Sequence, residues 1–320
     1  MTDLPLPPDT KTWILTNGMA GFEAQGLGIA AALGVTPELK RVAPPAPWKW
    51  LAPFGPAAPN PGIRPPFPDL LIASGRQSIP YARRIARKSP RTCVAVLQDP
   101  RVNPALFDFV WTPAHDGLKG ANVITTLTSP HRVTPELLAQ EAARIAPGIA
   151  HLPHPRIAVL LGGKNAVYDF SEEDARRIAD ALATLAEGGA GLMITPSRRT
   201  GETQLSIIRD RLKDHPVLIW DGAGANPYFG FLGAADAIIA TCDSVNMLGE
   251  AASTGKPLHV VELAGGSPKF RRFLDALYAS GTARLFALPL ETWAYAPLNA
   301  THDIASAVAR AYRAKRAKTP

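Results

Sequence analysis

Short apolar runs rich in β-branched residues alternate with segments of helical pattern along almost the whole chain. In the first half, these runs predict strands over 13–16, 70–73, 92–97, 109–112 and 122–125. In the second half, they predict strands over 157–161, 191–195, 217–220, 237–240 and 258–262. Such alternation is typical of βαβ units and parallel sheets. The sequence therefore predicts an α/β protein built of two Rossmann-like, doubly wound domains.

Local signals place several helix starts and the domain boundary. Thr36-Pro37-Glu38 and Thr134-Pro135-Glu136 each combine a cap, a proline at the first helical position and an early acid. Ser171 gives a weaker capping signal. Two prolines within 151–155 interrupt any helix just before a new strand, which is typical of a linker. We therefore expect domains over 1–150 and 151–320, separated by a cleft, and the C-terminal helix can pack back onto the first domain.

Size and composition limit the class of protein. A chain of 320 residues with 46% hydrophobic residues can form two cores. No apolar run approaches the roughly 18 residues that cross a bilayer, and the first eight residues do not resemble a secretion signal. We expect a cytoplasmic protein, either free or peripheral on the inner face of the membrane. Cys93 and Cys242 fall in predicted strands, and His151 and His154 in the linker, so neither a metal site nor a cofactor is predicted.

The net charge of +7 is concentrated in two windows. The basic residues of these windows are Arg76, Arg83, Arg84, Arg87, Lys88, Arg91, Arg310, Arg313, Lys315, Arg316 and Lys318. Such clusters attract anionic surfaces, and a solvated helix face with a loose tail is the alternative. No nucleic-acid motif or pattern of basic and stacking aromatic residues accompanies the charge, so a nucleic-acid partner is not favoured.

A proline-rich stretch over 43–56 places Trp48, Lys49, Trp50 and Phe54 in a predicted loop. Exposed aromatic rings beside lysine can lie at a membrane interface or line a channel for a lipid acceptor. We therefore predict an anionic membrane surface as a partner of Trp48, Trp50 and the basic clusters. A loop folded onto its own domain is the alternative.

In open α/β sheets, ligands bind beyond the carboxyl ends of the strands, so the loops after strands are the candidate sites. The loop after the first strand contains Gly18 and Gly21, which let a backbone approach an anion at a helix start. A tight structural turn competes equally with this interpretation. Glu23 in that loop, and Asp99 and His115 after later strands, have the chemistry to take a proton from an acceptor hydroxyl.

Two loops of the second half favour an anionic ligand. Gly162 and Gly163 follow a predicted strand as a phosphate-approaching loop does, but no GK[ST] follows, so ATP hydrolysis is not indicated. A second loop, over 197–200, brings two guanidinium groups and two hydroxyls to a strand end, and this combination suits phosphate oxygens. Its residues are Ser197, Arg198, Arg199 and Thr200.

The segment 241–257 carries the clearest pattern. Asp243 or Ser244 can cap a helix whose N–H groups would then face a diphosphate. Asn246 and Glu250 lie four residues apart on one face of this helix, and Met247 lies between them. A capped structural helix explains the hydroxyls but not a carboxylate on an otherwise small-residue, apolar helix.

These segments together resemble the elongated-mitochondria, or mitochondrial fission, family. In the second half the resemblance rests on Gly162-Gly163, Ser197-Arg198-Arg199-Thr200, Asn226-Pro227-Tyr228, Ala235-Asp236, Asp243-Ser244-Val245-Asn246-Met247, Glu250-Ala251, Gly255-Lys256-Pro257 and Lys269-Phe270. In the first half it rests on Gly21, Gln25, Asp99-Pro100-Arg101, Phe107-Asp108, His115-Asp116-Gly117 and His131-Arg132-Val133. The motifs are specific as a set and cover nearly the whole chain.

The resemblance implies a GT-B arrangement like that of glycosyltransferases. In such enzymes the C-terminal domain holds a nucleotide sugar and a glutamate placed like Glu250 binds the ribose, with Asn226 among the matching positions. The N-terminal domain holds the acceptor and, in inverting enzymes, a general base. The chain has Phe22 and Glu23 where lipid-linked peptidoglycan glycosyltransferases have a histidine, which leaves the base open among Glu23, Asp99 and His115.

Three alternative functions follow, of which the first is the leading hypothesis. The first is metal-independent transfer of a sugar from a nucleotide-diphosphate donor to an envelope or lipid-linked acceptor. The second is a non-catalytic GT-B scaffold that binds membranes or partner proteins. The third is nucleotide-sugar 2-epimerase chemistry, which would turn over the donor without an acceptor.

Overall fold

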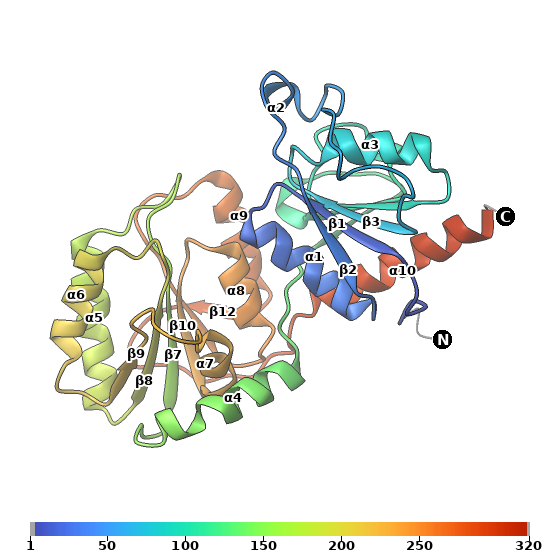
Figure 1. Ribbon diagram of the computed structural model, residues 1–320. Coiled ribbons are helices and arrows are strands. Elements are labelled where there is room, and N and C mark those ends of the chain that lie inside the picture. Colours follow the sequence, from blue (N-terminus) through green and yellow to red (C-terminus); the bar gives the residue numbers. More distant parts are fainter. Residues whose placement is uncertain (1–3, 319–320) are drawn as a thin grey trace. The chain divides into compact units, whose positions relative to one another are not determined.

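The computed structural model describes residues 4–318 and divides into two compact units (Figure 1). The first unit is Met1–Arg132 with Asn299–Pro320, and the second is Val133–Leu298. This division differs from the boundary expected near 150. Helix α4 (Pro135–Ile149) packs against α7 (Tyr228–Ala234) and therefore belongs to the second unit. The prolines of 151–155 connect α4 to the next strand inside that unit.

The first unit contains one parallel six-stranded sheet in the order β2-β1-β3-β4-β5-β6. Its strands are β1 (Thr12–Thr16), β2 (Pro37–Arg41), β3 (Leu70–Ser74), β4 (Cys93–Leu97), β5 (Phe109–Pro113) and β6 (Val123–Thr126). Its helices are α1 (Ala20–Ala32), α2 (Trp48–Leu51), α3 (Ile79–Lys88), the 3-10 turns η1 (Pro104–Leu106) and η2 (Ala114–Asp116), and α10 (Ala300–Lys318). After β2 the chain returns to the other side of β1, so the order of strand addition reverses between the parallel strands β1 and β3, which is the switch point of this sheet.

The helix expected to begin at Thr36-Pro37-Glu38 is wrong, because these residues lead into the edge strand β2. Glu38 and Leu39 lie beside Trp13 and Ile14 in the parallel register. The strand exposes most of its polar side chains to solvent on the edge of the sheet, so the apolar run that marks the inner strands is missing. The pairing with β1 overrides the local capping signal.

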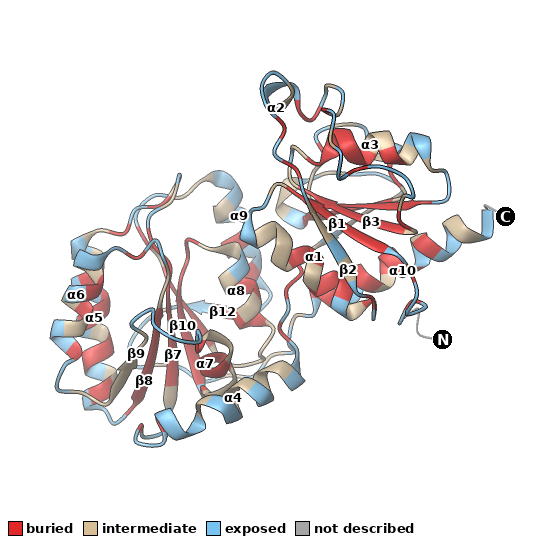
Figure 2. Ribbon diagram, viewed as in Figure 1, coloured by how far each residue is buried: buried red, intermediate tan, exposed pale blue. Residues whose placement is uncertain are grey.

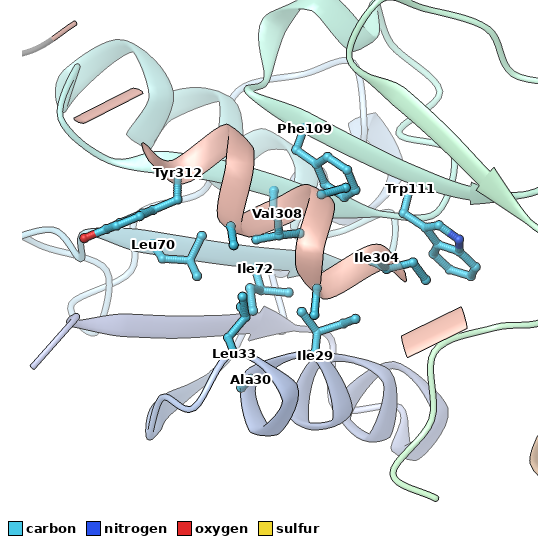
Figure 3. Packing of buried hydrophobic residues seen from close by; sticks show 14 of the residues in the cluster. Ile29, Ala30, Leu33, Leu70, Ile72, Phe109, Trp111, Ile304, Val308 and Tyr312 are labelled. Carbon is cyan, nitrogen blue, oxygen red and sulfur yellow. The ribbon is translucent and has the colours of Figure 1, made fainter. Parts of the chain in front are cut away.

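Helix α10 covers one face of the first sheet and is part of its core (Figure 3). Ile304, Val308 and Tyr312 pack with residues of α1 and of the strands, among them Ile29 and Phe109. A spacing of three to four residues between buried positions is the pattern of a helix with one apolar face. The C-terminal segment is therefore a packed helix rather than a loose tail.

Polar contacts fix both ends of α10 to the first unit. The Thr301 hydroxyl donates to the carbonyl oxygen of His131 at 2.9 Å and accepts the His131 backbone N–H at 2.9 Å. Near the other end, Lys315 lies 2.9 Å from Asp108 and Arg316 lies 3.1 Å from Asp69. These acids neutralise two members of the C-terminal basic cluster.

The opposite face of the first sheet is covered by α3 and by the proline-rich segment. Tyr81 and Ile85 of α3 pack against strand residues of a second core cluster, and Trp48 of α2 packs at its margin. Trp50 in the same short helix is exposed. Figure 2 shows that the inner strands are buried and the edge strands are not, and that α2 is mostly exposed.

The second unit contains a parallel six-stranded sheet in the order β12-β11-β10-β7-β8-β9. Its strands are β7 (Arg156–Leu161), β8 (Gly191–Pro196), β9 (Val217–Ile219), β10 (Ala237–Thr241), β11 (Leu258–Val261) and β12 (Ala283–Leu285). Its remaining helices are α5 (Glu172–Glu187), α6 (Glu202–Leu212), α8 (Val245–Ala252) and α9 (Pro268–Ala279). The five expected strands are confirmed, whereas the short edge strand β12 was not predicted.

Capping explains two of the helix starts. The Ser171 hydroxyl accepts the N–H of Asp174, and the Asp174 carboxylate accepts the Ser171 N–H in return, which forms a capping box. The Thr134 hydroxyl accepts the N–H of Leu137 at the start of α4. Both starts were predicted from the sequence. Across residues 4–318, no helix combines the length and apolarity needed to cross a bilayer.

Candidate functional site

The candidate site of the second unit lies where β7 and β10 are neighbours. The order in which the chain adds strands to the sheet reverses between these two parallel strands. Ligands of open α/β sheets bind beyond the carboxyl ends of the strands at such a point. The loop after β7 carries Gly162 and Gly163, and the loop after β10 carries Asp243 and Ser244. Ser244 caps α8 by accepting the N–H of Met247 at 3.3 Å. The positive end of the α8 dipole is therefore at this edge of the sheet.

Asp243 joins the three loops of this edge and is buried. Its side chain has an exposed fraction of 0%. Its carboxylate accepts the Gly163 N–H at 3.0 Å and the Thr241 hydroxyl at 2.6 Å. The Arg199 guanidinium lies 2.8 Å from it. A carboxylate with donors on all sides is held internally, so Asp243 shapes the site rather than contacting a ligand.

Gly162 and Gly163 are required by close packing of the loops. A Cβ on Gly162 would lie 1.9 Å from the Oδ1 atom of Asp243, and a Cβ on Gly163 would lie 1.9 Å from the carbonyl oxygen of Arg199. Neither contact leaves room for a side chain. The two glycines therefore let the loops after β7, β8 and β10 pack against one another. This packing requires glycine at both positions whether or not a phosphate approaches the backbone.

The residues of the loop after β8 divide into internal and outward groups. The hydroxyls of Ser197 and Thr200 both donate to the Gly162 carbonyl oxygen, at 2.9 and 2.6 Å. The Arg199 guanidinium donates to the Gly163 carbonyl oxygen at 3.0 Å and pairs with Asp243. Arg198 is exposed and makes no hydrogen bond or ion pair in the described part of the chain. Of the two arginines, Arg199 is therefore engaged by other loops of the sheet edge, and Arg198 is not.

Arg198 lines a pocket of about 470 Å³ at the ends of β8 and β9. Ser197, Thr200 and Trp220 also lie in its wall. The Trp220 indole N–H donates to the Ala223 carbonyl oxygen at 2.9 Å, which fixes the ring. The pocket combines a guanidinium group, hydroxyls and an aromatic ring, a set that suits a phosphate with an attached planar or apolar group.

Glu250 projects from the second turn of α8 and is oriented by Tyr228. The Tyr228 hydroxyl donates to the Oε2 atom of Glu250 at 2.7 Å. Desolvation, and then the charge of Glu250, raise the pKa of Tyr228, so the phenol stays a protonated donor. Asn226 precedes this tyrosine, and its side-chain oxygen accepts the Tyr228 N–H at 2.9 Å. Asn246, one turn before Glu250, is exposed.

Lys256 fixes α7 and was not assigned a role from the sequence. Its Nζ atom donates to the carbonyl oxygens of Leu232 and Gly233, both at 2.6 Å, in the last turn of α7. A cation at a helix C-terminus satisfies carbonyls that have no helical partner. Desolvation lowers the pKa of Lys256 to about 8, against the opposing charge of Asp236. The lysine therefore holds the helix that presents Tyr228 to Glu250.

Thr241 is a second residue that sequence reasoning missed. Its hydroxyl accepts the Gly162 N–H at 2.8 Å while donating to Asp243. A threonine as the last residue of a buried strand is the only signal in the sequence, and it does not identify these partners. In the described residues 4–318, no three His, Cys, Asp or Glu side chains are placed to hold a metal ion.

In the first unit, Glu23 lies in the first turn of α1 and pairs with β2. Both of its carboxylate oxygens accept from Arg41, at 2.7 and 2.9 Å. These hydrogen bonds, with the charge of Arg41 and against some desolvation, hold the pKa of Glu23 below its ordinary value. A carboxylate stabilised in this way is a weak general base. Gly18, with φ of 85°, forms the turn before α1, and Gly21 lies within the helix itself.

Replacing Arg41 with methionine is expected to raise the pKa of Glu23, measured by NMR titration of its carboxyl carbon. The native pair stabilises the fold above the pKa of Glu23 in the unfolded chain, and this contribution is lost as pH falls through the lowered folded pKa. The stability difference between wild type and variant should therefore be largest near neutral pH. Lys40→Met is the matched control, and an unchanged Glu23 pKa in Arg41→Met would contradict the assignment.

Asp99 and His115 lie at the same carboxyl edge, after β4 and after β5. The Asp99 carboxylate accepts the Arg101 N–H at 2.8 Å and lies 3.4 Å from the Arg101 guanidinium. The His115 imidazole lies 4.0 Å from Asp116, and its side chain is 6% exposed. Among the three candidate bases, Asp99 is the one that lines a pocket of the first unit.

Comparison with known sequences decides the family. The profile described as mitochondrial fission ELM1 matches residues 20–312. The chain belongs to the ELM1 family. It is 30% identical over 276 residues to mitochondrial fission protein ELM1 of Arabidopsis thaliana, covering 78% of this chain and 65% of the plant protein. It is 27% identical over 280 residues to an uncharacterized protein of Rickettsia prowazekii, covering 75% of this chain and 79% of that one.

The chain thus spans about two thirds of the length of its plant relative. Solved structures similar to it share its fold. UDP-GlcNAc 2-epimerase from Methanocaldococcus jannaschii matches with a TM-score of 0.58 at 11% identity, covering 93% of this chain and 98% of that one. A glycosyltransferase from Rickettsia africae matches at 0.51 and 10% identity, covering 97% and 94%. The ELM1-family chain therefore has the GT-B fold of glycosyltransferases and sugar-nucleotide epimerases, as the resemblance implied.

A third structure of this kind is UDP-GlcNAc 2-epimerase from Neisseria meningitidis bound to UDP-GlcNAc, with a TM-score of 0.51 at 12% identity. The match covers 96% of this chain and 94% of the epimerase. At such identities the likeness concerns the fold. The chemistry of the ELM1-family chain has to be argued from its own residues.

Proposed function

We propose that this ELM1-family chain binds a nucleotide-diphosphate sugar at the second unit and transfers the sugar to an envelope or lipid-linked acceptor. The observation that carries the proposal is that the capped α8 N-terminus, the exposed Arg198 and the Tyr228–Glu250 pair all follow the carboxyl ends of strands of one parallel sheet. A diphosphate needs positive charge and hydrogen-bond donors, whereas a ribose needs an acceptor for its two hydroxyls. These three elements supply both.

The transfer would need stabilisation of a leaving nucleoside diphosphate. The α8 dipole and the Arg198 guanidinium can supply it without a metal ion, because fixed donors in a shaped site stabilise developing negative charge. Asn226, Asn246 and Met247 lie after strands of the same sheet and would frame the ligand. The Ser197 and Thr200 hydroxyls donate to the Gly162 carbonyl oxygen and would shape the loop around it. Arg199 would act indirectly, because it holds Asp243 and the glycine loop in place.

The acceptor would lose a proton to a base of the first unit. Glu23 is held by Arg41, and its lowered pKa makes it a poor proton acceptor. Asp99 lines an open pocket, and we propose it as the base, with His115 as the alternative. Solved structures similar in fold include UDP-GlcNAc 2-epimerases, one of them bound to UDP-GlcNAc, and this likeness supports a nucleotide sugar as the donor.

Glu250→Ala is expected to weaken nucleotide-diphosphate binding about 10-fold or more, because a hydrogen bond to a charged group contributes about 1.5–3 kcal/mol. Titration calorimetry with UDP, GDP, ADP, CDP and dTDP identifies the nucleotide and then measures each variant. Tyr228→Phe should give a smaller loss, since the carboxylate remains but is less well oriented.

Glu173→Ala, on the exposed face of α5, is the matched control and should bind like wild type. An unchanged dissociation constant in Glu250→Ala would remove the ribose role of Glu250. Failure of the wild-type chain to bind any of the five nucleotides would remove the proposed function itself.

A second function is favoured by exposed apolar side chains of the first unit. Trp50 is 72% exposed and Phe54 is 69% exposed, beside the basic helix α3. A scaffold that binds anionic membranes would use this surface without nucleotide chemistry. Flotation with anionic vesicles, compared between wild type and Trp50→Ala, tests it. Trp48 is a poor choice for this test because it packs against the core.

Epimerase chemistry is distinguished by its products. A 2-epimerase converts the nucleotide sugar with no acceptor present, so a change of the donor sugar alone, followed by NMR, would favour that reaction. Transfer instead releases nucleoside diphosphate only when an acceptor is added.

A further inference from the structure

The first unit has a pocket of about 530 Å³ at the carboxyl ends of β3 and β4. One part of its wall is aromatic and consists of Phe22, Trp50 and Phe54. Another part is polar and consists of Arg76, Gln98, Asp99 and Arg101. A pocket with separate apolar and cationic walls suits a ligand that has both an apolar chain and an anionic group.

The aromatic wall is braced in its exposed position. Arg76 donates to the carbonyl oxygen of Lys49 at 3.1 Å, and Arg83 donates to those of Pro53 and Phe54 at 3.1 and 2.9 Å. Arg76 joins the α2 segment to the loop before α3, and Arg83 joins it to α3 itself. The exposure of Trp50 and Phe54 is therefore built into the fold rather than a result of a loose loop, and exposed apolar patches of this kind mark binding surfaces.

The polar wall has an unusual backbone. Gln98 has φ of 78° and Arg101 has φ of 58°, and among the described residues no other non-glycine residue has a positive φ. Gln98 is held by its N–H, which donates to the Trp111 carbonyl oxygen at 2.6 Å, and by its amide, which donates to Gln25 at 3.3 Å. Backbone strain maintained by its surroundings is frequent at ligand sites. Here it presents Asp99 and Arg101 to the pocket.

The surrounding charge favours an anion. Residues 39–98 contain ten lysines and arginines and a single acidic residue, Asp69, which pairs with Arg316. Asp99 is the one acid among the residues that line the pocket, and it lies 3.4 Å from the Arg101 guanidinium. Arg101 is 74% exposed at its side chain, and its guanidinium group has further donors to offer.

We propose that this pocket binds an amphiphile with a phosphate group and an alkyl or isoprenoid chain. Arg101 and Arg76 hold the phosphate, and Phe22, Trp50 and Phe54 hold the first part of the chain. As a substrate class for the acceptor this rests on the proposed function, because it makes the acceptor a lipid-linked phosphate whose reacting hydroxyl meets Asp99. As a binding site it stands on the pocket alone.

The test uses dodecyl phosphate below its micelle concentration, without any nucleotide, and follows tryptophan fluorescence and calorimetry on the full chain. We expect dodecyl phosphate to bind at least 10-fold more tightly than inorganic phosphate, which has no chain, or dodecyl maltoside, which has no charge. Equal binding of dodecyl phosphate and dodecyl maltoside would overturn the role of the arginines. Binding to anionic vesicles with none to monomeric dodecyl phosphate would overturn the pocket in favour of a membrane surface.

Two variants locate the site. Trp50→Ala with Phe54→Ala should weaken binding of dodecyl phosphate at least 10-fold, and Arg101→Gln, which does not brace α2, should weaken it about 5-fold. Leu106→Ala and Arg91→Gln are matched controls on exposed residues outside the pocket and should bind like wild type. Wild-type affinity in both pocket variants would place the ligand elsewhere and overturn the proposal.

The outcome is independent of the donor experiment. Binding of dodecyl phosphate without binding of any nucleotide would support the amphiphile site and overturn its role as an acceptor site. Binding of nucleotide without binding of dodecyl phosphate would support the proposed donor site and overturn the amphiphile site.

Discussion

Replacing Ala305 with aspartate is expected to unfold the first unit while the second unit stays folded. Ala305 is 0% exposed in α10, among residues of the first core cluster. A carboxylate there has no room and no partner, which costs about 4 kcal/mol or more. That is a large fraction of the roughly 5–15 kcal/mol by which a domain is stable.

Hydrogen exchange followed by mass spectrometry measures each unit in the same chain. Peptides from β3, β4 and β5 should lose protection in Ala305→Asp, and peptides from β7, β8 and β10 should keep it. Ala314→Asp is the matched control, because Ala314 is exposed on the same helix and should change little. Loss of protection in both units at once would show that they do not unfold independently, and full protection would mean that α10 is not part of the core.

The sequence predicts the inner strands well because they are buried on both faces. β3, β4, β7 and β10 each contain an apolar run that covers all or all but one of their residues, and runs of this kind are typical of parallel strands between helices. The edge strand β2 lacks such a run, and its Thr36-Pro37-Glu38 signal is the same as that of a real helix start at Thr134. Only the pairing of Glu38 with Trp13 separates the two cases, and a local pattern does not contain it.

Helix α10 illustrates a second limit. Its basic residues predict attraction to anionic surfaces, yet two of them pair with Asp69 and Asp108, more than 200 residues earlier in the chain. The small buried residues of the helix, such as Ala305 and Ala309, are apolar but not distinctive in a sequence. Their role becomes visible only when the helix lies on the first sheet.

The sequence predicted which loops form the candidate site, but it did not predict the contacts between their side chains. The glycine loop, the loop over 197–200 and the capped α8 were expected together because each follows a strand. The sequence gives Arg198 and Arg199 the same chemistry, whereas the structure separates them through Asp243, which lies 44 residues further along the chain. Contacts between loops of different strands depend on strand order, which the sequence pattern leaves open.

Asp243→Ala is expected to destabilise the second unit by about 3 kcal/mol. The change removes the acceptor of the buried Gly163 N–H and of the Thr241 hydroxyl, and it leaves the Arg199 charge without its partner. Breaking a buried pair costs about 3–5 kcal/mol, and the lower end applies because Arg199 is 40% exposed and stays partly hydrated. Urea unfolding, followed by circular dichroism and by exchange in the β7 and β10 peptides, measures the loss.

Variants of the two arginines distinguish an effect on stability from an effect on ligand binding. Arg199→Gln should cost about 2 kcal/mol, since the Asp243 carboxylate keeps two hydrogen-bond donors but loses its counter-charge. Arg198→Gln, the adjacent control, should change stability by less than about 0.5 kcal/mol and weaken nucleotide-diphosphate binding about 10-fold. The reverse result, with full stability and lost binding in Arg199→Gln, would make Arg199 a ligand. In that case Asp243 would position Arg199 for the ligand rather than stabilise the fold of the second unit.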